Sequence, residues 1–122
     1  MYDAMQAARA GGLLAAAVDC YGGFVVATAA EGHPLHGSPP LAERAGDLSS
    51  PLLGLFGADD QQPAPEHVAE LEAALEAHGK TFEFHSYDGA GHAFMQVDRP
   101  NYRPEAAVDA WQHIWSFFGR YL

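Results

Sequence analysis

The chain has 122 residues, of which 48% are hydrophobic and 18% charged, a composition typical of one globular domain with a core. Its formal net charge of −10, from 16 acidic and 6 basic residues, excludes the basic surface that nucleic acid requires. No apolar run reaches the roughly 20 residues needed to cross a bilayer, so we expect no membrane span. One cysteine, Cys20, and an amino terminus unlike a signal peptide favour a reducing compartment, and we expect a cytoplasmic protein.

The first third of the sequence predicts a helix, a strand and a long loop. Residues 2–10 are rich in Ala, Met and Gln, which favour a helix, and the glycine pair that follows supplies its stop. The apolar run 13–21 is typical of a strand buried on both faces of a parallel sheet. Residues 24–50 show no sustained period, so we expect a loop with a short helix near residues 41–45.

The next segment predicts a second strand and a helix. Residues 51–56 are short, apolar and bounded by turn signals, which indicates another buried strand. A helix is expected from Pro65, where a missing amide is tolerated, to Gly79, which closes it. Its buried face is predicted to carry Val68, Leu71 and Leu75.

The remaining segment predicts a third strand and a last helix. In residues 81–87, Phe82 and Phe84 alternate with polar side chains, as in a strand nearer the sheet edge. A helix from Pro104 is expected to bury one aromatic face, comprising Ala107, Trp111, Ile114 and Phe118. Strands that alternate with helices predict an α/β fold, a three-layer α/β/α arrangement with a parallel sheet.

Two motifs follow the predicted strands at their carboxyl ends, where ligands gather in open α/β sheets. Asp60 lies three residues beyond Gly57, and His92 lies in the glycine-rich loop DGAGHAF. An acid of this kind is more often a turn residue, and a lone histidine a loop residue. The order acid, then histidine, after successive strands instead favours a catalytic acid and base, in the chain order used by α/β-hydrolases.

The stretches LLGLFGADD, YDGAGHAF, DRPNYRPEAA and AWQHIWSFFGRYL, together with AAAVDCYGG further upstream, resemble the dienelactone hydrolase family over nearly the whole chain. The resemblance implies a truncated α/β-hydrolase fold, in which residues 1–122 form the C-terminal half of a single domain. It implies hydrolysis of an ester or lactone, with no cofactor. It also implies that Asp60 is the orienting acid and His92 the general base of a Cys/Ser-His-Asp triad.

The nucleophile of such a triad stands on a strained strand-to-helix turn. VDCYGG, residues 18–23, resembles the family's nucleophile motif, but Val18 replaces the first glycine. The resemblance places this stretch at the strand after that turn and its helix, so we interpret Cys20 as a buried structural cysteine. We therefore expect the nucleophile upstream of Met1 and the chain alone to be nearly inert.

Several charged residues have no clear role. The six histidines other than His92 show no metal-ligand spacing, so we assign no metal. They are His33, His36, His67, His78, His85 and His113. Arg99 and Arg103 either attract a carboxylate substrate or are solvated surface side chains, and the second is the commoner case. Gln96 stands where related dienelactone hydrolases have an arginine, which puts dienelactone itself in doubt as the substrate.

Two rival interpretations remain open. The chain is either half of an ester or lactone hydrolase, or a noncatalytic half-domain that assembles with a partner chain through an exposed sheet edge. A third, less favoured interpretation keeps catalysis on the chain through Cys20. Because the strand 13–21 lacks the elements that would cover it, we expect self-association or poor folding of the isolated chain.

Overall fold

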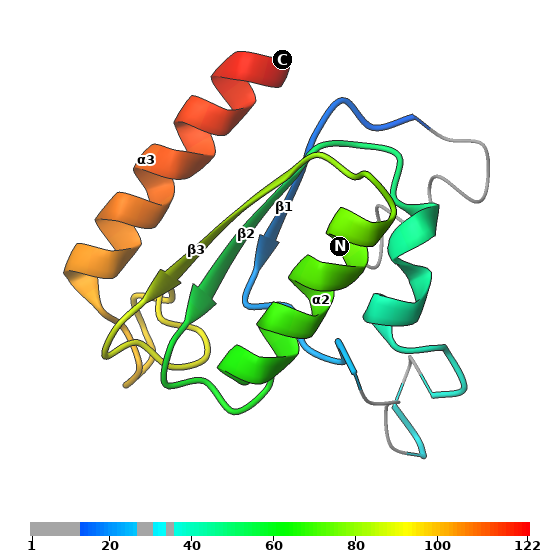
Figure 1. Ribbon diagram of the computed structural model, residues 1–122. Coiled ribbons are helices and arrows are strands. Elements are labelled where there is room, and N and C mark those ends of the chain that lie inside the picture. Colours follow the sequence, from blue (N-terminus) through cyan, green and yellow to red (C-terminus); the bar gives the residue numbers. More distant parts are fainter. Residues whose placement is uncertain (1–12, 27–30, 34–35) are drawn as a thin grey trace.

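The computed structural model describes residues 13–26, 31–33 and 36–122. Three parallel strands form one sheet in the order β1 (Ala17–Cys20), β2 (Leu52–Gly57) and β3 (Phe82–Tyr87), as Figure 1 shows. The register pairs residue 17 with 52 and residue 52 with 82. The predicted helix over residues 2–10 lies outside the described residues.

Helices cover both faces of the sheet, which confirms the predicted α/β/α layers (Figure 1). On one face lie the 3₁₀ helix η1 (Leu41–Asp47) and helix α2 (Pro65–Ala77), whose core contains Leu48, Leu71 and Leu75. On the other lies α3 (Pro104–Tyr121), whose core contains Leu55, Phe94, Ile114 and Phe117.

The central strand β2 connects the two cores, because all six of its residues are buried. Leu52 points to the η1 and α2 face, whereas Leu53 and Leu55 point to the α3 face, as the alternation of a strand requires. The predicted edge strand is also confirmed, since β3 pairs only with β2 in the described part of the chain. The carboxyl ends of all three strands therefore meet at one edge of the sheet.

Helix α2 has the predicted bounds and buried face. Pro65 is its first residue, and the chain leaves it at Gly79, whose φ of +64° is a left-handed conformation that glycine adopts without a Cβ penalty. Val68, Leu71 and Leu75 are buried as expected. No helix in the described ranges is long and apolar enough to span a membrane.

Two predictions about burial were wrong. The first strand is limited to Ala17–Cys20 and is not buried on both faces, because only Asp19 of its four residues is buried. Leu13, which was predicted to belong to it, is 92% exposed. Trp111 does not belong to the buried face of α3, where its side chain is 48% exposed. The contact stripe of α3 contains Ala107, Ala110, Ile114 and Phe117, while Phe118 is only partly buried beside it.

Candidate active site

Asp60 lies in the turn that follows β2, where its side chain is held from two sides. The carboxylate is 3% exposed, and the backbone amide of Gln62 donates a hydrogen bond to Oδ1 at 2.9 Å. The Asp60 amide itself donates to the carbonyl of Gly57 at 3.2 Å. These bonds fix the carboxylate so that Oδ2 remains for another partner.

That partner is His92, in the loop after β3. Its Nδ1 lies 2.8 Å from Asp60 Oδ2, and its side chain is 52% exposed. An ionised carboxylate only accepts hydrogen bonds, so Nδ1 carries the proton in this pair and the neutral ring keeps its lone pair on Nε2. The structure thus brings together the two residues singled out in the sequence, and Asp59 and Asp88 take no part in the bond.

Gly57 allows the two loops to approach each other this closely. A Cβ on Gly57 would lie 2.3 Å from the Ala90 carbonyl oxygen and 2.7 Å from that of Gly91. Across the same junction, the Asp59 amide donates to the Ala90 carbonyl at 2.9 Å and the Ala58 amide donates to that of Tyr87 at 3.0 Å. The glycine that ends β2 therefore determines how near His92 lies to Asp60.

The turn after β1 forms a third side of the site. Tyr21, with a φ of 46°, packs edge-on against the His92 ring at 5.2 Å between centroids, and it contacts Phe94 in the same way at 5.6 Å. In β1, just before this turn, the buried Asp19 accepts a hydrogen bond from the Gly22 backbone, and burial raises the pKa of its carboxyl. A Cβ on Gly22 would meet Asp19 Oδ1 at 2.2 Å, so this turn also needs a glycine.

An open pocket of about 600 Å³ lies where these loops converge. It is lined by Cys20, Tyr21, Gly22, Gly23, Phe24, Asp60, Gln61, Gln62 and His92. Its position outside the carboxyl ends of parallel strands is the usual place for a ligand in an α/β sheet.

Cys20 lines this pocket but is poorly suited to nucleophilic attack. Burial, and then the charge of Asp19, raise the pKa of its thiol, which disfavours the reactive thiolate. The described residues after Cys20 form a turn and bends rather than a helix, so the strand-to-helix turn that activates a nucleophile is not formed here. The side chain contributes instead to the core beneath α3.

The two arginines after His92 differ in their surroundings. Arg103 binds the chain itself, with Nε donating to the Gly89 carbonyl at 3.1 Å and Nη1 to that of Tyr102 at 3.0 Å. Arg99 lines a second hollow of about 420 Å³ together with His92 and Gln96. Arg103 therefore holds the histidine loop, and Arg99 is the arginine within reach of a ligand beside His92.

Two contributors to the site were missed in the sequence. The bond from the Gln62 amide to Asp60 involves backbone, which residue type does not reveal. Tyr21 was assigned to a strand, although its place directly before two glycines is a turn signal that favours a residue at a strand end.

Comparison with known proteins gives relatives along most of the chain. The family model described as "Dienelactone hydrolase family" matches residues 4–122. A Methylorubrum extorquens protein named "Putative carboxymethylenebutenolidase" is 42% identical over 77 residues, which are 63% of this chain and 26% of that protein. A Salmonella typhimurium protein of the same name is 36% identical over 110 residues, covering 88% of this chain and 38% of its own length.

Solved structures agree with the sequence comparison. The crystal structure titled "Putative Dienelactone Hydrolase from Klebsiella pneumoniae" superposes with a TM-score of 0.73 at 36% identity, over 87% of this chain and 42% of that one. An acylaminoacyl peptidase with a TM-score of 0.73 at 16% identity supports the α/β-hydrolase fold alone. The chain thus spans less than half the length of these relatives, and on the family match over residues 4–122 it belongs to the dienelactone hydrolase family.

Proposed function

We propose that this chain supplies the acid and base of a hydrolase that cleaves a carboxylic ester or lactone. The observation that carries the proposal is the 2.8 Å hydrogen bond between Asp60 Oδ2 and His92 Nδ1, two residues that line the pocket. Family membership supports the reaction class, and the relatives named carboxymethylenebutenolidase act on a lactone by name.

In this proposal His92 moves the proton and Asp60 holds the ring. His92 Nε2 accepts the proton from an attacking hydroxyl or thiol, and the imidazolium is stabilised by the Asp60 carboxylate, which stays ionised. The proton then passes from Nε2 to the leaving oxygen, and water repeats the cycle on the acyl intermediate. Tyr21, packed against the ring, limits its rotation and so keeps Nε2 directed at one place.

The attacking atom in this proposal does not belong to the described residues. Cys20 has a raised thiol pKa and no following helix, and no other Ser or Cys lines the pocket among those residues. We place the nucleophile on a strand-to-helix turn outside this sequence, which also supplies one oxyanion amide. The chain alone should therefore hydrolyse p-nitrophenyl acetate no faster than its His92→Ala variant.

A chimera tests the roles of Asp60 and His92 directly. Residues 4–122 replace the matching part of the Klebsiella pneumoniae protein, which supplies the remainder of the domain. We expect hydrolysis of p-nitrophenyl acetate that falls roughly 10³-fold or more in His92→Ala and in Asp60→Asn. His78→Ala, at an exposed histidine beyond α2, is the matched control and should retain full activity.

Two results would reject the assignment. If the His92→Ala chimera keeps its rate, the base is a different residue. If Cys20→Ser abolishes hydrolysis by the isolated chain while His92→Ala does the same, the nucleophile is Cys20.

We also propose that the open edge of β1 pairs with further chain, either a second copy or a partner. Leu13 and Leu14 are 92% and 42% exposed, and β1 has one neighbour among the described residues. Sedimentation of the isolated chain should show oligomers or an expanded, poorly folded species. A monodisperse monomer with a cooperative unfolding transition would contradict this half-domain proposal.

A further inference from the structure

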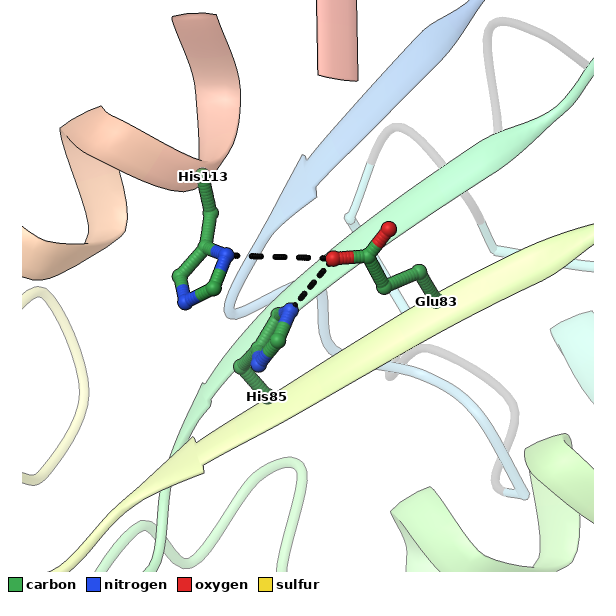
Figure 2. A group of neighbouring side chains, drawn as sticks. All are labelled: Glu83, His85 and His113. Carbon is green, nitrogen blue, oxygen red and sulfur yellow. Dashed lines mark hydrogen bonds and ion pairs between the residues drawn. The ribbon is translucent and has the colours of Figure 1, made fainter. Parts of the chain in front are cut away.

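Away from the pocket, three side chains that bind metals well converge between β3 and α3 (Figure 2). Glu83 and His85 lie two residues apart on β3 and so point to the same side of the sheet, toward α3. His113 projects from α3 to meet them. His85 Nε2 lies 2.7 Å and His113 Nδ1 3.8 Å from Glu83 Oε1, and one ligand atom from each residue lies within 4.8 Å of the others.

The orientation of His113 is set by a carboxylate behind it. Asp109 Oδ2 lies 3.2 Å from His113 Nε2, one helical turn earlier on α3, and also accepts a hydrogen bond from the Tyr87 hydroxyl at 2.9 Å. Because the carboxylate only accepts, Nε2 carries the ring proton and the lone pair of Nδ1 faces Glu83. A carboxylate bonded to the far nitrogen is the usual support of a metal-binding histidine.

The imidazole rings of His85 and His113 lie face to face. They stack with centroids 3.6 Å apart and an interplanar angle of 22°. Because the nitrogen lone pairs lie in the ring planes, one ring must rotate before both nitrogens face a single ion. The hydrogen bond from His85, and then the Arg120 guanidinium, lower the pKa of Glu83. One carboxylate oxygen and two imidazole nitrogens lie within 4.8 Å of one another.

We propose that Glu83, His85 and His113 bind a divalent transition metal of the Zn²⁺ type, through Glu83 Oε1, His85 Nε2 and His113 Nδ1. Tetrahedral zinc with bonds near 2.0–2.1 Å holds its ligand atoms roughly 3.3–3.4 Å apart, and the separations of 2.7 and 3.8 Å from Glu83 Oε1 are each within about 1 Å of that value. Rotation of one imidazole ring completes the fit. On binding, the single ring proton of His85 moves from Nε2 to Nδ1, so that the Nε2 lone pair faces the metal. The fourth coordination position of the metal faces water, since each ligand side chain is about a third exposed.

The position of Arg120 predicts how its removal changes the affinity for the metal. Its guanidinium contacts Oε2 of Glu83 and leaves Oε1 for the two histidines. A fixed positive charge so close to the site opposes a dication, and it competes for the same carboxylate. Removing that charge should tighten metal binding, whereas a cluster that only joins β3 to α3 would be weakened by losing Arg120.

Isothermal titration of the full chain with ZnCl₂ tests the site. We expect one saturable zinc per chain, weakened at least about tenfold in His85→Gln and in His113→Gln. Asp109→Asn should weaken binding about 10–100-fold through His113, and Arg120→Gln should strengthen it roughly threefold or more. His78→Gln, exposed and remote from the cluster, is the control and should bind as the unaltered chain does.

A second measurement keeps the test decisive if the histidine variants fail to fold. In the unaltered chain, substoichiometric zinc should shift the imidazole NMR signals of His85 and His113 while those of His67 and His78 stay in place. Equal zinc affinity in His85→Gln, His113→Gln and His78→Gln, or shifts spread over all histidines, would overturn the proposal. So would the absence of saturable binding by a folded chain.

Discussion

Substitution of Gly57 by alanine should separate the loop after β2 from the loop after β3, whose contact positions His92. The new Cβ would lie 2.3 Å from the Ala90 carbonyl oxygen, about 0.7 Å inside the 3.0 Å that real Cβ atoms respect, and the obstacle is backbone rather than a flexible side chain. The loop must shift and the bond from the Asp59 amide to Ala90 must lengthen. Overpacking of about 1–3 kcal/mol plus about 1 kcal/mol for the weakened bond predicts a loss of about 2–4 kcal/mol.

Urea unfolding of the chimera, in which the remainder of the domain is present, measures this loss by far-ultraviolet circular dichroism. The downfield NMR signal of the His92 Nδ1 proton reports the bond to Asp60. The matched control is Gly91→Ala in the same loop, where a Cβ meets nothing within 4 Å. That variant should change stability by less than about 0.5 kcal/mol and keep the signal. If Gly57→Ala unfolds at the same urea concentration as Gly91→Ala, contact at Gly57 does not position the loop.

Three further substitutions test the fold and the electrostatics of the site. Asp19→Asn should stabilise the chain at pH 7, because burial raises the pKa of Asp19 in the folded state and the stability of the protonated form is lost as pH rises through that pKa. The gain in stability, measured by urea unfolding, should therefore vanish in acid. A difference that does not change with pH would contradict this account. Phe117→Ala should cost about 3–5 kcal/mol, since the ring is 1% exposed, whereas Trp115→Ala at 68% exposure should cost well under 1 kcal/mol in the same assay. Arg103→Met should speed amide hydrogen exchange in residues 89–101, because three carbonyl contacts disappear, and unchanged exchange would show that the arginine does not hold the loop.

Local patterns predicted the parts of the fold that depend on local chemistry. Helix α2 was predicted from Pro65 to Gly79 because its start, its stop and its apolar spacing all lie within one segment. Strand β1 and Trp111 were misjudged because burial depends on what packs against a residue from elsewhere in the chain. An apolar run without covering neighbours remains partly exposed.

The same distinction applies to the two sites. Asp60 and His92 were found in the sequence because each follows a strand, and parallel strands bring their carboxyl ends to one edge whatever the details of packing. His85 and His113 were assigned no metal because they are 28 positions apart and lie on different elements. Only the packing of α3 against β3 places them side by side.

Both tryptophans of the chain stand on the outer side of α3, where Trp111 and Trp115 stack at 5.8 Å between centroids. Their fluorescence should already be that of indoles in water when the chain is folded, so emission wavelength is a poor gauge of unfolding for this protein. The same exposure makes the fluorescence of the pair a sensitive probe of binding at α3. A shift of their emission toward the blue would mean that another surface has come to lie over α3.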